Sequence, residues 1–245
     1  MRSAPTWSVG WSVSRLVAGL LIAAAVIAQA TRTIGGAIDR SADVATTAVN
    51  FFSFFTVLSN LFSVVVLLIV GLLGVLRRGE PDVEPFALDV ARACVMTYMI
   101  VTGVVYNLLL RGVALPQGTT VPWSNEVLHV VGPLFLLADV LFGSNPPRLP
   151  WRSVLGILIF PIVWVVYTLV RGPMVTNPVT GAAWWYPYPF LDPHVVNGYA
   201  GVVPYVIGIA VALGAFALGV VYVGRRRTVG PAPEAEPVSP AGQVL

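Results

Sequence analysis

A stripe of hydroxyl and amide side chains lies in one of the apolar segments of this 245-residue chain. Ser53, Thr56, Asn60 and Ser63 fall at positions i, i+3, i+7 and i+10, so on a helix they share one face, and Ser59 adds another hydroxyl beside it. Exposing such groups to lipid is costly, so we expect the stripe to face other protein or a cavity. A hydroxyl there can act as a nucleophile, bond to a neighbouring helix, or bond back to a carbonyl of its own helix.

A second apolar segment carries the histidine best placed for proton transfer. Glu126 and His129 are three residues apart and share a helix face. Pro133 has no N–H, so the carbonyl of His129 should lose its helical partner, and the helix should kink there. The alternative for His129 is a packed, hydrogen-bonded core histidine.

Thr56 and His129 are expected at one depth. Thr56 lies about five residues and His129 about four residues into their helices, which places both within about 6–8 Å of the outer ends. A hydroxyl and an imidazole at one depth can meet, and this is the minimum for a nucleophile and its general base. In that case Glu126 would orient His129, and Asn60 would donate to an oxyanion.

The composition indicates which kind of structural element must position these residues. Hydrophobic residues make up 57% of the chain and charged residues 10%, against about 25% charged in an average soluble domain. This excludes a soluble enzyme, a disordered protein and a nucleic-acid binder. Six runs are long enough to cross a membrane and predict an all-α, six-helix bundle; they are residues 13–30, 51–76, 93–110, 125–142, 153–170 and 199–223.

The arginines predict the orientation. All 14 basic residues are Arg, and ten of them lie on one side of the predicted spans, namely Arg2, Arg15, Arg77, Arg78, Arg92, Arg148, Arg152, Arg225, Arg226 and Arg227. The remaining four are Arg32, Arg40, Arg111 and Arg171, so the rule that positive loops stay inside places both termini in the cytoplasm. At the cytoplasmic ends, Asp139 is then expected to pair with Arg148 or Arg152.

Three regions follow from these spans. They are a cytoplasmic segment at 1–12, a membrane domain at 13–224, and a Pro/Glu-rich tail at 225–245 that we expect to be disordered and cytoplasmic. The start of the chain also resembles a signal peptide that ends at Ala28-Gln29-Ala30, and cleavage there would leave five spans.

One loop on the predicted outer side is aromatic and stiffened by proline. It reads Trp184-Trp185-Tyr186-Pro187-Tyr188-Pro189-Phe190. Such a segment is typical of an interfacial aromatic belt, and it also suits a lid over a site that opens toward the outer leaflet. The two roles are compatible.

The chain has too few of the residues that common cofactor and metal sites need. A single cysteine, Cys94, excludes an internal disulfide. His129 is the only His inside a predicted span, because His194 lies in a loop, so a haem held by two membrane histidines or a His-rich metal site lacks ligands. The chain has no Lys for a phosphate loop and no Gly-x-Ser-x-Gly elbow. We therefore expect no cofactor and no metal.

Several segments resemble the bacterial six-span family related to androgen-induced protein. They are Phe52–Asn60, Leu128–Pro133 through Asp139, Thr97–Asn107, Phe160–Tyr167, and Tyr186–Tyr188 with Phe190-Leu191-Asp192. The resemblance covers about residues 13–223. Vertebrate relatives are membrane-embedded hydrolases of fatty-acid esters of hydroxy fatty acids, with a threonine nucleophile and a histidine in separate spans. The resemblance implies these roles for Thr56 and His129, with Ser53 and Ser59 as competing hydroxyls.

Two functions of different classes remain open at this point. The first is a lipid-ester hydrolase that acts on a small lipid-like substrate from the membrane. The second is a non-catalytic carrier of lipids or small molecules, or an accessory membrane protein. An Arg- and Ala-rich chain without Lys is typical of a high-GC bacterium, so we expect a multi-pass protein of the bacterial plasma membrane that binds membrane lipid and no nucleic acid. The sequence names no protein partner.

Overall fold

The computed structural model describes residues 6–77, 84–113 and 120–228. Six helical spans in these ranges are long and apolar enough to cross a membrane, as the sequence predicts, and no strand occurs in them. The spans are α1 (Thr6–Asp39), α3 (Phe55–Leu76), α4 (Phe86–Val105) with the π-helix η1 (Tyr106–Leu110), α5 (Pro122–Glu126) with the π-helix η2 (Val127–Val131) and α6 (Gly132–Phe142), α7 (Ser153–Arg171), and α8 (Tyr199–Thr228). The all-α, multi-pass class is therefore confirmed.

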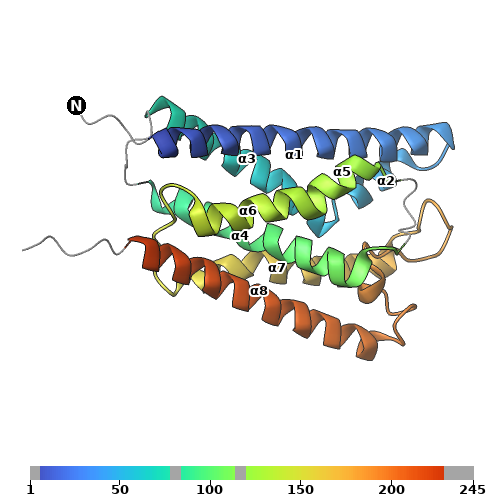
Figure 1. The fold of residues 1–245 in the computed structure, drawn as a ribbon. Helices are drawn as coiled ribbons and strands as arrows, with labels where there is room; N and C mark the ends of the chain where they lie inside the picture. The colour runs from blue at the N-terminus through green and yellow to red at the C-terminus, as the bar shows by residue number, and fades with distance from the viewer. Residues whose placement is uncertain (1–5, 78–83, 114–119, 229–245) are drawn as a thin grey trace, which may run out of the picture.

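The bundle surrounds α4 (Figure 1). Along α4, Val95, Met96, Tyr98 and Met99 are almost completely buried, whereas α7 and α8 bury the smallest share of their length. The start of α1 and the end of α8 lie at one end of the bundle, here called the terminal end (Figure 1). At the opposite end lie the short helix α2 (Val44–Phe51), α5 and the α7–α8 connection, which contains the short 3-10 helices η3 (Gly172–Met174) and η4 (Pro189–Leu191).

Several helices extend beyond the predicted spans. Helix α1 begins at Thr6, inside the segment expected outside the membrane domain, and runs unbroken through residues 28–30 to Asp39. Helix α8 continues to Thr228, because Arg225 and Arg227 donate to backbone carbonyls of the α6–α7 region instead of ending the helix in solvent. Most of the predicted tail, residues 229–245, lies outside the described residues.

The second predicted span is divided. Helix α2 ends at Phe51, and α3 begins only at Phe55 after an extended Phe54 with φ −69° and ψ 131°. The prediction that Ser53 belongs to the helical stripe is therefore wrong. Its hydroxyl instead donates to the Val49 carbonyl at 2.8 Å and lies 3.0 Å from the Tyr167 hydroxyl, which holds the break against α7.

Asp139 has a different partner from the one predicted. Its carboxylate binds the Arg15 guanidinium at 2.7 Å and the Trp11 indole N–H at 2.6 Å, rather than Arg148 or Arg152. Both ion-pair side chains are almost fully buried. Arg15 lies two residues after the start of the first predicted span, which begins at residue 13, and a charge buried there needs a charged partner. This pair joins α1 to α6 at the terminal end.

Candidate functional site

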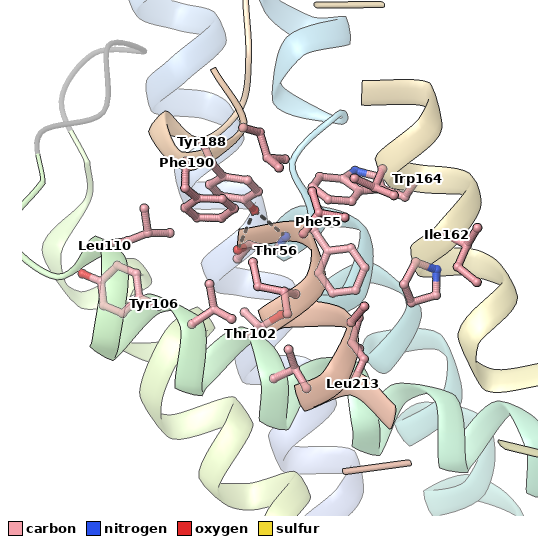
Figure 2. A pocket seen from close by; sticks show the side chains of 18 of the residues that line it. Phe55, Thr56, Thr102, Tyr106, Leu110, Ile162, Trp164, Tyr188, Phe190 and Leu213 are labelled. Carbon is pink, nitrogen blue, oxygen red and sulfur yellow. Dashed lines mark hydrogen bonds between the residues drawn. The ribbon is translucent and has the colours of Figure 1, made fainter. Parts of the chain in front are cut away.

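Thr56 is the second residue of α3 and points toward the α7–α8 connection. Its backbone N–H donates to the Tyr188 hydroxyl at 3.1 Å, and its own hydroxyl lies 3.2 Å from the same oxygen (Figure 2). The first N–H groups of a helix have no acceptor within the helix. The Tyr188 hydroxyl therefore supplies the acceptor that the Thr56 N–H would otherwise lack. The break before Phe55 thus places Thr56 at a helix N-terminus.

The other stripe residues are engaged in packing. Ser59 donates to the Thr56 carbonyl at 3.1 Å and lies 3.2 Å from the Thr102 hydroxyl. The Asn60 amide donates to the carbonyls of Thr56 at 2.8 Å and Leu128 at 3.3 Å. These contacts join α3 to α4 and η2, as expected for polar groups that avoid lipid. The Asn60 amide therefore already has acceptors for its protons, which weakens its expected role as an oxyanion donor.

His129 lies in η2, and one of its ring nitrogens is already hydrogen-bonded. Its Nδ1 lies 2.9 Å from the Asn125 carbonyl, which can only accept, so Nδ1 carries the proton in the neutral ring. Nε2 is then left as the acceptor, as a general base requires. The Tyr106 ring stacks on the imidazole with centroids 3.9 Å apart and fixes its plane.

The backbone around His129 is also arranged by its neighbours. The His129 carbonyl, which Pro133 was expected to leave open, accepts from the Asn107 side chain at 3.4 Å. Gly103 lets α4 approach this point, since a Cβ there would lie 2.7 Å from the Pro133 Cβ and 3.3 Å from the His129 carbonyl oxygen. The π-helices η1 and η2 are the segments that carry Asn107 and His129, and π-helical turns recur at functional sites.

Glu126 has a partner other than His129. Its carboxylate binds Arg111 at 3.1 Å, and both side chains are half exposed. An exposed pair of this kind contributes about 0–1 kcal/mol. The imidazole is oriented by the Asn125 carbonyl and Tyr106, so Glu126 is at most an indirect support for it.

Two cavities meet at Thr56. The larger has a volume of 310 Å³, is almost wholly apolar, and is enclosed by side chains of α3, α4, α7, α8 and the α7–α8 connection, including Phe55, Trp164, Phe190 and Leu213 (Figure 2). The smaller, of 100 Å³, adds polar groups and is lined by His129 together with Gln29, Thr33, Thr120 and Asn125. Four residues line both cavities: Thr56, Tyr106, Leu110 and Tyr188. Thr56 alone lines either cavity among the four stripe residues and Ser59 beside them, namely Ser53, Thr56, Ser59, Asn60 and Ser63.

The aromatic loop covers this site. Trp185, Tyr186, Tyr188 and Phe190 are all buried, and Tyr188 and Phe190 stack with centroids 5.2 Å apart. Burial raises the pKa of the Tyr188 phenol above its ordinary value of 10.0, so its hydroxyl stays protonated. The loop is held down where the Trp185 backbone N–H donates to the Gly172 carbonyl at 2.9 Å. The segment therefore forms a wall of the site, as the lid interpretation requires.

Sequence reasoning missed several residues that line the site. Tyr188 was identified only as part of an aromatic run, and Tyr106 only within a motif. Gln29 and Thr33 extend the polar wall from α1, and the Gln29 side chain donates to Thr33 at 3.2 Å. The four-residue spacing of Gln29 and Thr33 within an apolar helix was the available signal.

The site brings Thr56 and His129 to one cavity without joining them. The Thr56 hydroxyl bonds to Tyr188 and the His129 ring bonds to Asn125, and among the described residues no hydrogen bond connects the two directly. In the same ranges no three His, Cys, Asp or Glu side chains form a group that could hold a metal ion. No protein-family model matches this chain, and no curated protein or solved structure matches it either.

Proposed function

We propose that this protein is a membrane-embedded hydrolase of fatty-acyl esters, with Thr56 as nucleophile and His129 as general base. The observation that carries the proposal is that both residues line one 100 Å³ cavity, while Thr56 also lines the apolar 310 Å³ cavity. The motif resemblance to the threonine hydrolases related to androgen-induced protein points to the same two residues.

The proposed reaction starts with proton transfer. Nε2 of His129 accepts the Thr56 hydroxyl proton as Oγ1 attacks the ester carbonyl carbon. The alcohol leaves with the proton returned by His129, which produces an acyl-Thr56 ester, and a water activated by His129 then releases the fatty acid. Substrate binding must bring Oγ1 and Nε2 to about 2.6–3.2 Å, a distance that resting sites often exceed.

The N-terminus of α3 is the better candidate for stabilising the oxyanion. The Thr56 N–H lies in the first turn of a 22-residue helix and now donates to the Tyr188 hydroxyl at 3.1 Å. An N–H of this kind, supported by the helix dipole, suits a developing negative charge. Asn60 lies one turn farther on, and its amide already donates to two carbonyls.

The two cavities give the substrate an orientation. The apolar cavity suits an acyl chain, and its volume falls at the lower end of the range of about 300–1,000 Å³ for ligand pockets. The smaller cavity suits the alcohol part, because Gln29, Thr33 and Asn125 place polar side chains on its wall. The scissile carbonyl would then lie between them, at Thr56.

A carrier would need a polar path past Asp139, and the contacts of Asp139 argue against one. Its carboxylate is held by Arg15 and Trp11. The space beside it is a separate cavity of 10 Å³, room for about one water.

Turnover by purified protein tests the proposal. The natural protein should hydrolyse a panel of lipid esters, and Thr56→Ala should abolish turnover and the acyl adduct that mass spectrometry finds on the Thr56 peptide. Ser53→Ala and Ser59→Ala are matched controls that should keep activity, because neither residue lines either of the two cavities at Thr56. Full activity in Thr56→Ala, or an adduct on another residue, would refute the assignment.

A further inference from the structure

A cationic groove lies at the terminal end, away from the Thr56 site. It has a volume of 530 Å³ and is formed by the α6–α7 connection and the last turns of α8, which lie side by side at that end (Figure 1). Its lining residues are Arg148, Leu149, Pro150, Trp151, Tyr222, Arg225 and Arg226. Three of these seven are Arg and, among the described residues that line it, none is acidic.

Aromatic rings hold two of the guanidinium groups. Arg225 lies over the Trp151 ring at 5.4 Å and also donates to the Leu149 carbonyl at 3.2 Å. Arg226 lies over the Tyr222 ring at 5.2 Å. Stacking occupies the face of a guanidinium, whereas its N–H donors point outward in the plane of the group, where they can bind an oxyanion.

The groove is formed before any ligand arrives. A Cβ at position 224 would clash with the Pro147 carbonyl oxygen, so Gly224 lets α8 pack directly on the connection. The Arg148 backbone N–H donates to the Asp89 carboxylate at 3.2 Å, and Arg227 donates to the Gly143 carbonyl at 2.6 Å. These contacts fix both walls of the groove.

The position of the groove identifies the ligand class. It lies beside the start of the apolar span Ser153–Met174 and the end of the apolar span Tyr199–Arg227. This is the level of lipid headgroups. Nearby, Leu155 on α7 and Leu218 on α8 are exposed, so lipid chains can lie against both helices. We propose that this groove binds the phosphate of an anionic phospholipid, with Arg148 and Arg226 as ligands and Trp151 at the headgroup–chain boundary. Guanidinium groups recognise phosphate through paired N–H donors.

Native mass spectrometry of the full chain tests the proposal. Detergent-purified protein is titrated with phosphatidylglycerol and, separately, with phosphatidylcholine, and bound lipid is counted. Phosphatidylglycerol should bind more tightly. Arg148→Gln and Arg226→Gln should each weaken it about fivefold, from about 1 kcal/mol per Arg near a membrane surface. Arg226→Lys keeps the charge but loses the planar fork, so it should lose part of the affinity.

The matched control is Arg77→Gln, which removes one charge at the end of α3 and outside the groove. It should leave phosphatidylglycerol binding unchanged, and all variants should melt at the temperature of the natural protein. An equal loss in Arg77→Gln would mean attraction by overall charge and would overturn the proposal. Displacement of the lipid by an equal concentration of inorganic phosphate would overturn the lipid assignment in favour of a soluble anion. Neither outcome bears on the hydrolase site, which is read out by ester turnover.

Discussion

The two ends of the bundle use polar residues in opposite ways. At the terminal end, charged side chains are buried and paired: Asp139 with Arg15, and Arg92 with Glu84 at 2.9 Å. At the opposite end, the buried polar groups are neutral, and some of them line the 100 Å³ cavity that lies beside the apolar cavity of 310 Å³. A buried ion pair fixes the positions of the helices that carry it, because separation leaves a charge without compensation. Neutral groups around a cavity leave room for a ligand, so one end holds the helices in place and the other leaves open space between them.

The largest expected effect is at the cavity end and concerns His129. His129→Ala should lower kcat/KM for ester hydrolysis by about 10²–10⁴-fold, the usual contribution of a general base. Glu126→Gln should lower it much less, because Glu126 binds Arg111 rather than the ring. Steady-state kinetics of the two folded variants provides the comparison, and equal, complete loss from both would show that Glu126 has been given the wrong role.

At the terminal end, breaking the buried pair should cost stability. Asp139→Ala leaves Arg15 buried without its partner, so we expect a loss of about 3–5 kcal/mol in unfolding free energy, measured by denaturation in detergent. Replacing both residues, in Arg15→Met with Asp139→Leu, should recover much of it. The exposed Glu126–Arg111 pair is the control at the other end, and Glu126→Gln should cost about 0–1 kcal/mol. A double variant as unstable as Asp139→Ala would mean that the pair is not the source of the stability.

The close approach of α4 to the segment of His129 gives a third test. Gly103→Ala should destabilise the fold by about 1–3 kcal/mol, because its methyl group meets Pro133 and the His129 carbonyl in a filled space. It should also lower turnover by moving His129. Gly214→Ala in α8 is the matched control, since nothing lies within 4 Å of a Cβ there. Equal melting temperatures for the two variants would contradict the packing described.

The smallest expected effect is that of the Tyr188 hydroxyl. Tyr188→Phe removes the oxygen that lies 3.2 Å from the Thr56 hydroxyl and orients it, and should lower kcat by a factor equivalent to about 0.5–1.5 kcal/mol, one hydrogen bond. Tyr167→Phe, which loses a similar bond to Ser53, is the control and should keep its activity.

The pH dependence of the Tyr188 variant follows from the direction of its pKa shift. A raised pKa keeps the phenol protonated beyond pH 10.0, its ordinary value, so Tyr188 should not titrate below that pH. The kcat profiles of the natural protein and Tyr188→Phe should then run parallel from neutrality to about pH 10. An alkaline limb below pH 10 that is present only in the natural protein would contradict this burial.

Much of the fold could be predicted from the sequence, because length and hydropathy alone decide where a helix can cross a bilayer. The limits of α1 and α8 could not, since they depend on partners for Arg15, Arg225 and Arg227 that come from α6 and from the α6–α7 connection. The break before α3 was hidden for a similar reason. Phe54 is apolar, so a hydropathy profile shows no interruption at this residue, although tertiary contacts hold its backbone in an extended conformation.

For the site, the sequence could indicate which residues need partners but not which partners they have. Thr56 and His129 were selected by the cost of polar groups in lipid and by depth, and the structure places both on one cavity. The partner of Asp139 was predicted wrongly because Arg15 is 124 residues away, and nearness in sequence favoured Arg148. Tyr188 comes to Thr56 across 132 residues, a distance that no local pattern spans.

The Arg15–Asp139 pair also has a consequence for how the chain is made. Arg15 enters the membrane with the first helix, and the carboxylate that neutralises it is synthesised 124 residues later, an interval of about 6–25 s at about 5–20 residues per second. An isolated Arg costs about 2.5–3.5 kcal/mol to insert at the centre of a membrane helix, and less near a helix end, where Arg15 lies. Until α6 arrives, α1 is therefore expected to sit displaced along its axis, with Arg15 reaching toward the headgroups. We therefore expect the final depth of α1 to be set late in biogenesis, when α6 supplies Asp139.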